Sequence, residues 1–355
     1  MRVALAGPPQ SGKTTLFRAV ASAAGSEVDT HRPDQPHAAI VKVPDKRIGW
    51  LTRLYDSAKV TPAEVEFLDV PGMDLSDAAG RNRARTHWGT MRQSDMFVLV
   101  VRAFEDASVP PYRDRIDPAA DVRELLDEMI FADLDQVTAR IEKLEKAVKK
   151  PVADRTAQQR ELEVMKRLAE SLEAEQPASA AVQSDADEKL IRSFAFCSMK
   201  PMLVALNTSE DDLSGGDEQI ASLPSIRLSA RIEEEIAQLP ADERGEFLSD
   251  LGIEEPAGDR LIRSCLRQMR LISFFTAGEK ETRAFTVPEG TDALTAAGEI
   301  HSDIARGFIR AEVVSFDDLQ AAGDMKTARS AGAVRLEGKS YVIQDGDVVY
   351  FRFNV

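Results

Sequence analysis

The residues with the clearest chemical potential lie near the start of the sequence, where residues 7–14 match the pattern G-x-x-x-x-G-K-[ST] directly after the apolar run 3–6. The two glycines of such a loop let consecutive backbone N–H groups approach phosphate oxygens, and the helix that follows directs its positive end at them. Lys13 would reach the β- and γ-phosphates, and Thr14 would offer its hydroxyl to Mg²⁺. The loop predicts a nucleoside triphosphate site formed by Gly7, Gln10, Ser11, Gly12, Lys13, Thr14 and Thr15.

A second motif, D-x-x-G, occupies residues 69–72 at the end of the alternating stretch 65–68. In phosphate-loop proteins a carboxylate at this place holds Mg²⁺, and the glycine N–H contacts the γ-phosphate, so the loop beyond it senses hydrolysis. The motif is weak alone because an Asp-Val-Pro-Gly turn is common, but it gains weight behind a phosphate loop. We expect Thr14 and Asp69 to bind the metal, and we expect phosphoryl transfer to depend on Lys13, Thr14, Asp69 and Gly72.

A third motif follows the apolar run 201–206, where Asn207 and Glu210 stand in the order N-x-x-E. A GTPase carries N-K-x-D here, and its aspartate accepts both N–H groups at the edge of guanine. In this chain the acid is one methylene longer, and Thr208 replaces the lysine that flanks the base. The predicted ligand is therefore ATP, with GTP as the alternative. The predicted contacts on the base side are Asn207, Thr208, Glu210, Ser229 and Ala230.

Two stretches outside these motifs have their own periodicity. Apolar side chains recur every three or four residues from about 118 to 150, and the same period restarts between Leu162 and Leu172 after a break at Pro151. This pattern predicts an antiparallel coiled-coil hairpin inserted into the nucleotide domain. From about residue 277 the sequence changes to short alternating strands with glycine turns, which predicts a β-rich module.

Together these motifs resemble the YchF/Obg-like ATPase family of Obg-related translation factors, whose members read N-x-x-E. The resemblance covers nearly the whole chain, with further similar stretches at residues 43–48, 101–106, 274–281, 307–313 and 345–355. It implies a phosphate-loop domain followed by a TGS-like β-grasp domain. It also implies Mg²⁺-dependent ATP binding and hydrolysis, and the ribosome or ribosomal RNA as a partner.

Three positions depart from the family pattern. Pro33 occupies the place of the switch-one threonine, and it offers neither a hydroxyl to Mg²⁺ nor an N–H to the γ-phosphate. The segment after Gly72 lacks the glycines of the family, and Gln10 replaces the asparagine of its phosphate loop. Because phosphoryl transfer depends on positioning and charge stabilisation, we expect slow hydrolysis.

Composition narrows the class of protein. The 45 Lys and Arg against 60 Asp and Glu give a net charge of -15, which argues against bulk binding to nucleic acid or to anionic membranes. Cys197 and Cys265 lie in apolar contexts and suit a reducing compartment. With no leader or spanning segment expected, the sequence predicts a cytoplasmic protein without a membrane partner or DNA specificity.

The predicted fold is α/β, with a phosphate-loop NTPase sheet (G domain) at residues 1–117 and 191–276, an inserted helical hairpin at 118–190 and a TGS-like β-grasp domain at 277–355. The predicted function is a switch that binds ATP with Mg²⁺ and hydrolyses it slowly. One alternative is an adaptor that binds nucleotide without significant turnover, which the changes at Pro33 and after Gly72 favour. Another is a GTPase with relaxed base readout, which Glu210 disfavours.

Overall fold

The computed structural model describes residues 1–26, 28, 30, 32, 34–149, 155–213, 218–240 and 243–354. The chain forms two compact units, one of residues 1–39 with 66–258 and the other of residues 40–65 with 259–355. The units therefore divide the chain differently from the sequence-based boundaries, because residues 40–65 pack with the C-terminal part.

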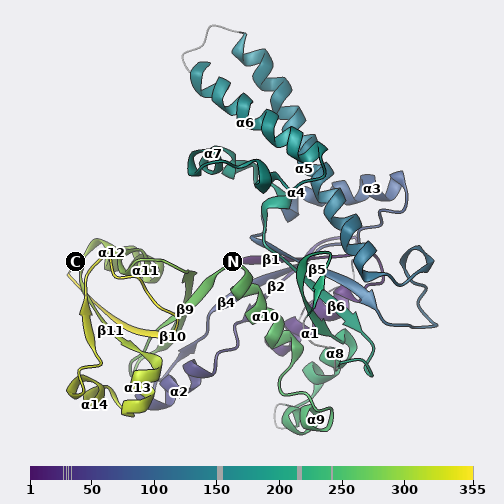
Figure 1. Cartoon of the computed structure of the whole chain (residues 1–355). Coiled ribbons are helices and arrows are strands. Elements are labelled where there is room, and N and C mark those ends of the chain that lie inside the picture. The colour runs from purple at the N-terminus through teal and green to yellow at the C-terminus, as the bar shows by residue number, and fades with distance from the viewer. Residues whose placement is uncertain are drawn as a thin grey trace. The chain divides into compact units, whose positions relative to one another are not determined.

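The first unit is built on a mainly parallel sheet whose strands follow the order β2-β4-β1-β5-β6-β8-β7 (Figure 1). Neighbouring strands from β4 to β8 pair in parallel, whereas β7 runs antiparallel to β8. Largely apolar stretches such as Met96–Ala103 are typical of strands that are buried on both faces of a sheet. The strands are β1 (Arg2–Ala6), β2 (His37–Lys42), β4 (Glu64–Asp69), β5 (Met96–Ala103), β6 (Met202–Thr208), β7 (Gln219–Ile220) and β8 (Leu223–Leu228).

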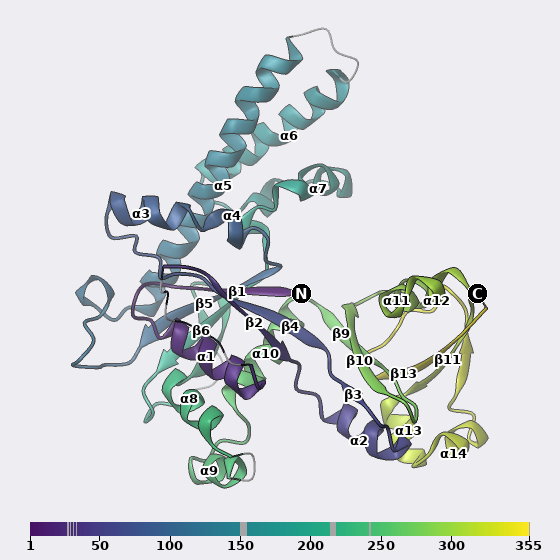
Figure 2. The same ribbon diagram turned by 180° about the vertical axis from the view of Figure 1, so that it is seen from behind.

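Helices cover both faces of this sheet. The helix α5 (Pro118–Val148) lies on one face with α3 (Ala78–Arg85) and α4 (Trp88–Met91), while α1 (Lys13–Ala23) and α8 (Ala230–Gln238) lie on the other, as both views show (Figures 1 and 2). Leu125 and Met129 of α5 pack with sheet residues in one apolar core. A further helix of this unit is α9 (Arg244–Asp250), and α10 (Ala257–Gln268) begins at the end of this unit and continues into the second.

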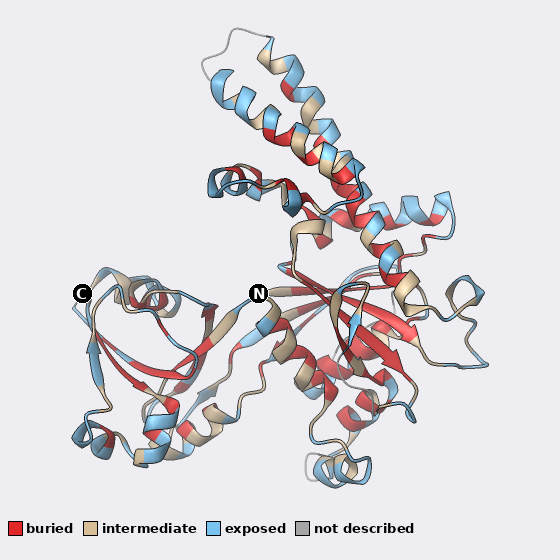
Figure 3. Ribbon diagram, in the orientation of Figure 1, coloured by how far each residue is buried: buried red, intermediate tan, exposed pale blue. Residues whose placement is uncertain are grey.

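The predicted hairpin is present as two helices that project from the sheet. Pro118 begins α5 behind the N-cap Asp117, and α6 (Arg155–Glu173) returns along it. Their apolar stripes face each other, and the buried residues follow this line in Figure 3. A further helix, α7 (Asp185–Ile191), and short 3₁₀ turns lead back to β6. The break predicted at Pro151 lies outside the described residues.

The second unit is a mixed sheet with strand order β12-β11-β13-β9-β10-β3. The predicted alternating strands are found at β10, β11 and β13, and residues 40–65 contribute α2 and β3, which pairs in parallel with β10. The strands are β3 (Val60–Thr61), β9 (Leu271–Thr276), β10 (Thr282–Pro288), β11 (Phe308–Ser315), β12 (Arg335–Glu337) and β13 (Asp347–Phe353). The helices are α2 (Lys46–Tyr55), α11 (Ala293–Ile300), α12 (Ser302–Arg306), α13 (Phe316–Ala322) and α14 (Met325–Ser330).

Two expectations from composition can be compared with the fold. Cys197 and Cys265 are both buried free thiols, as their apolar contexts predicted. Within the described parts of the chain, none of the helices combines the length and apolar character needed to cross a membrane.

Candidate nucleotide-binding site

The loop between β1 and α1 has the backbone that a phosphate-binding loop requires. A side chain at Gly7 would place its Cβ 2.2 Å from the carbonyl oxygen of Val100, so only glycine fits there. Gly12 has a φ of +86° and lies against the side chain of Asn207, and Gln10 also adopts a left-handed conformation with φ 61°. The turn ends at Lys13, the first residue of α1. Its N–H groups therefore meet the positive end of a helix, where anions bind.

Lys13, Thr14 and Asp69 come together at the carboxyl ends of β1 and β4. The Nζ atom of Lys13 forms an ion pair with Oδ1 of Asp69, and the hydroxyl of Thr14 donates to Oδ2 at 2.8 Å. Lys13 and Asp69 are 5% and 3% exposed. A charged pair so deeply buried beside a glycine loop is typical of a site made for a charged ligand.

Burial shifts the pKa of two basic side chains in this part of the site. Desolvation lowers the pKa of Lys13 by disfavouring its ammonium form, and the carboxylate of Asp69 opposes this effect. Burial also lowers the pKa of His87, and the positive charge of Lys13 adds to the shift. Both shifts favour the neutral form of the side chain, and only the carboxylate of Asp69 favours the ammonium form of Lys13.

Asn207 joins the phosphate loop to the loop after β8. Its Nδ2 donates to the carbonyl oxygen of Ser11 at 2.9 Å, and its Oδ1 accepts from the backbone N–H of Ala230 at 2.9 Å. Both groups of this buried amide are thereby used to fix the two loops relative to each other. Thr208 holds the same region through its hydroxyl, which donates to the carbonyl oxygen of Asp212 at 3.0 Å. Ser229 caps the start of α8 by accepting from Ile232 N–H.

Glu210 has a partner that the motif alone did not suggest. Its Oε1 lies 3.0 Å from Nε of Arg231, which also approaches Glu235 at 3.6 Å. Glu210 and Arg231 are 21 positions apart in the sequence, one in the loop after β6 and the other in the first turn of α8, so the spacing gave no signal for the contact. The acid and this arginine form an exposed ion pair at the rim of the site.

Two adjoining cavities contain the predicted residues. The first, here called the loop cavity, measures about 390 Å³ and is lined by Gln10, Ser11, Gly12, Lys13, Thr14, Thr15, Asp69 and Gly72, among others. The second, the Asn207 cavity, measures about 780 Å³ and is lined by Asn207, Thr208, Glu210, Ser229 and Ala230, with Phe104 and Val109 as apolar wall residues. Gln10, Gly12 and Thr15 line both. Gly7 alone among the predicted residues lines neither, because it lies beneath the loop against β5.

The switch-one region is only partly described. Thr30 lines the loop cavity together with Gln35 and His37. The prediction about Pro33 falls on a residue outside those that the structure describes. On the opposite side, a Cβ on Gly72 would lie 3.2 Å from Cα of Pro9, and the N–H of Met73 donates to the carbonyl oxygen of Gly7 at 3.0 Å. The segment after Gly72 is thus fastened to the phosphate loop.

Comparison with known proteins agrees with this geometry. Residues 271–354 match the YchF-GTPase_C family, "Protein of unknown function (DUF933)", and residues 2–153 match the MMR_HSR1 family, "50S ribosome-binding GTPase". A ribosome-binding ATPase YchF of Bacillus subtilis is 38% identical over 99% of this chain and 98% of its own length. The chain belongs to the YchF family.

Other similar proteins match along nearly the whole chain. Obg-like ATPase 1 of Oryza sativa is 31% identical and is matched over 100% of this chain and 92% of its own. The solved structure of the Schizosaccharomyces pombe YchF GTPase has a TM-score of 0.83 at 25% identity, over 99% of this chain and 97% of that one. A GTP binding protein from Pyrococcus horikoshii, with a TM-score of 0.58 at 18% identity over both full lengths, shares the fold. These matches confirm the predicted family and its phosphate-loop NTPase fold.

Proposed function

We propose that the chain is a Mg²⁺-dependent nucleotide switch that binds ATP in preference to GTP, hydrolyses it slowly and acts with the ribosome. The observation that carries the proposal is the buried cluster of Lys13, Thr14 and Asp69 in the loop cavity, which adjoins the larger Asn207 cavity. The loop cavity suits charged phosphates, and the Asn207 cavity suits a base and its sugar. Their volumes lie in the range of small-molecule sites.

The donor set of the cluster fits Mg²⁺. Thr14 and Asp69 offer hydroxyl and carboxylate oxygens 2.8 Å apart, and Mg²⁺ in nucleotide sites takes one or two such protein oxygens together with phosphates and water. When bound, the ion would neutralise charge on the phosphates. Lys13 supplies a second positive charge, and the N–H groups of the loop hold the phosphate oxygens in place.

The contacts of Glu210 support ATP over GTP. Guanine readout needs a carboxylate that can accept two N–H groups at the base edge, and a mismatched base leaves buried polar groups unpaired. Glu210 is longer than the aspartate used for this purpose, and its Oε1 is paired with Arg231. Phe104 on the wall of the Asn207 cavity offers an apolar surface that any base can use.

The residue after Gly72 supports slow turnover. Met73 is apolar and only 1% exposed, so it offers no group that could orient an attacking water. Ras-type enzymes place a glutamine there for that step. The relatives named ribosome-binding ATPases support both the nucleotide and the ribosome as ligands of this chain.

Single-turnover hydrolysis of ATP tests the enzymatic part of this proposal. We expect intrinsic turnover below about 1 s⁻¹, the lower end of kinase rates, and loss of turnover when EDTA removes Mg²⁺ or when Asp69→Asn removes the carboxylate. Binding without any turnover would instead identify the adaptor. An intrinsic rate well above 1 s⁻¹ would overturn slow hydrolysis.

Co-sedimentation with ribosomes tests the partner. We expect the chain to pellet with ribosomes to different extents with a non-hydrolysable ATP analogue and with ADP, because a switch must bind its partner differently in the two states. Lys13→Met is the control, since it removes the charge for the phosphates. Equal co-sedimentation in both nucleotides would contradict the switch, and no co-sedimentation in either would contradict the partner.

A further inference from the structure

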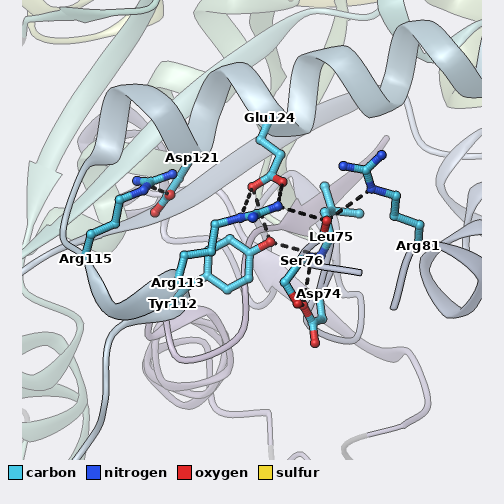
Figure 4. A network of polar contacts seen from close by, with 9 residues as sticks. All are labelled: Asp74, Leu75, Ser76, Arg81, Tyr112, Arg113, Arg115, Asp121 and Glu124. Atoms are coloured by element: carbon cyan, nitrogen blue, oxygen red, sulfur yellow. Dashed lines mark hydrogen bonds and ion pairs between the residues drawn. The ribbon is translucent and has the colours of Figure 1, made fainter. Parts of the chain in front are cut away.

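The segment that follows Gly72 is held by a group of residues outside the nucleotide cavities. Leu75 is 2% exposed, and both of its backbone polar groups bind side chains from a short turn before α5 (Figure 4). Its N–H donates to the hydroxyl of Tyr112 at 3.0 Å, and its carbonyl oxygen accepts from Nη2 of Arg113 at 3.0 Å. Arg81 of α3 donates to the same oxygen at 3.1 Å. Neighbouring residues of one turn therefore fix the peptide groups on both sides of Leu75.

The same two side chains converge on Glu124 of α5. The hydroxyl of Tyr112 donates to Oε2 of Glu124 at 3.2 Å, and Nε of Arg113 donates to that oxygen at 3.2 Å. A second arginine, Arg115, forms an ion pair with Asp121, which lies one turn before Glu124 in α5. Its Nη1 is 3.0 Å from Oδ1 of Asp121. The turn is thus fastened to the first turns of the helix that continues into the hairpin (Figure 4).

The backbone of the turn is strained in a way that needs these contacts. Arg113 and Asp114 both have φ 53°, a left-handed conformation that residues with a Cβ avoid. Two such residues in succession persist only where the surroundings determine them, and such strain is found preferentially at functional and switch segments. Here the surroundings are Leu75 on one side and Glu124 on the other.

Hydrogen bonds and a short stretch of backbone connect the phosphate loop to α5. The carbonyl oxygen of Gly7 accepts from Met73 N–H, Leu75 lies two residues further on, and Tyr112 with Arg113 joins Leu75 to Glu124. Tyr112 and Arg113 line neither the loop cavity nor the Asn207 cavity. Their contacts with Leu75 connect them to the nucleotide through the segment that they hold.

We propose that Tyr112 and Arg113 are positioning residues for the segment after Gly72, and that through Glu124 they transmit its nucleotide-dependent position to α5. This inference rests on the proposed function, because it assigns a regulatory connection to the same site. A displacement of residues 73–76 on γ-phosphate binding changes the distance between Leu75 and α5 unless the turn moves with it. The turn therefore links nucleotide state to the hairpin.

Tyr112→Phe is the decisive variant because it removes one hydroxyl and keeps the ring. Tyr350→Phe, at an exposed tyrosine on β13, is the matched control. We expect Tyr112→Phe to lower kcat for ATP by about five- to tenfold with KM changed less than twofold, because positioning is lost while nucleotide contacts remain. An unchanged kcat, or a rise in KM at unchanged kcat, would overturn the positioning role.

Hydrogen exchange gives a readout that does not need turnover. In the native chain, exchange of ADP for a non-hydrolysable ATP analogue should alter amide exchange both at residues 73–76 and in the first two turns of α5. In Tyr112→Phe we expect the first change to remain and the second to be lost, with both retained in Tyr350→Phe. Retention of both changes in Tyr112→Phe would overturn the connection alone. No response to either nucleotide in the native chain would overturn the proposed function and this inference with it.

Discussion

Lys13 and Asp69 are the residues on which the site depends most, because their ion pair is buried among few other polar groups. Among the described residues, the side-chain partners of Asp69 are Lys13 and Thr14, so removal of the lysine leaves a carboxylate in a low-dielectric setting. Loss of the lysine charge should therefore lower both the affinity for nucleotide and the stability of the fold. A second substitution, at Asp69, separates the effect on affinity from the effect on stability.

We predict that Lys13→Met weakens ATP binding at least tenfold, about 1.4 kcal/mol, and lowers the free energy of unfolding by about 3 kcal/mol. The double variant Lys13→Met/Asp69→Asn should regain most of the stability, because no unpaired charge is left, but not the affinity. Calorimetric titration and denaturant unfolding measure the two quantities. A double variant that binds ATP as the native chain does would show that the loop cavity is not the phosphate site.

A second prediction at this scale concerns the base. Glu210→Asp should shift the preference toward GTP, because a shorter acid can meet the edge of guanine and is released from Arg231. Glu235→Asp is the matched control, since Glu235 also pairs with Arg231 but does not line the Asn207 cavity. The ratio of the two nucleotide dissociation constants is the measurement. An equal shift of this ratio in both variants would mean that Arg231, and not Glu210, determines the preference for one base over the other.

Single residues were predictable where their role is local. Lys13, Thr14 and Gly12 follow from a loop of eight positions whose spacing already determines the geometry. The contacts of Glu210 with Arg231 and of Leu75 with Tyr112 join segments that are far apart in the sequence, and no periodicity relates them. The left-handed conformation of Arg113 could not be predicted either, because nothing in its residue type indicates a positive φ.

At the scale of elements, one buried acid anchors the hairpin to the sheet. Asp133 of α5 is fully buried and accepts from the N–H groups of Cys197 at 3.0 Å and Ser198 at 2.8 Å. These residues form the 3₁₀ turn that precedes β6. Burial raises the pKa of Asp133, while the two N–H groups and Arg92 favour the charged form. The helix and the turn thus share one carboxylate.

We predict that Asp133→Ala lowers the free energy of unfolding by about 2–4 kcal/mol, because two buried N–H groups lose their acceptor. Asp135→Ala is the control on the same helix, where the side chain is exposed and lies 3.8 Å from Arg85. Denaturant unfolding of both variants tests the difference. Equal stabilities would mean that water replaces the carboxylate and that the anchor is not needed.

The hairpin helices themselves were predictable because their period is regular. The apolar spacing placed the first helix at about 118–150, and α5 runs over Pro118–Val148. Asp133 could not be distinguished from its exposed neighbour Asp135 by the same reasoning. Both are adjacent to Leu134, and the packing of the turn at Cys197 makes one of them buried.

For the whole molecule, the most informative feature is that residues 40–65 belong with the C-terminal unit. Arg47 joins the two segments, since its guanidinium lies 2.8 Å from Asp45 and 2.7 Å from Asp345 and stacks over Phe275. Trp50 packs edge to face against Phe316. The sequence indicated a resemblance at residues 43–48 but not this role, because the pairing partners lie more than 200 positions away.

We predict that Arg47→Ala lowers the stability of this unit by about 1–2 kcal/mol, a modest loss because the pair with Asp345 is partly exposed. Arg53→Ala, an exposed change on the same helix, is the control. The chain has two tryptophans, so Trp50 fluorescence in a Trp88→Phe background reports on this unit during unfolding. Identical unfolding transitions for Arg47→Ala and Arg53→Ala would contradict a stabilising contact of Arg47 between residues 40–65 and the C-terminal part of the unit.

The central claim is that the two cavities form an ATP site, and titration of the native chain with Mg²⁺-ATP and Mg²⁺-GTP tests it most directly. The arrangement of Lys13, Thr14 and Asp69 predicts saturable binding of one triphosphate, and the pairing of Glu210 with Arg231 predicts that ATP binds more tightly. A preference for GTP of tenfold or more, about 1.4 kcal/mol, or no binding of either nucleotide, would contradict the account.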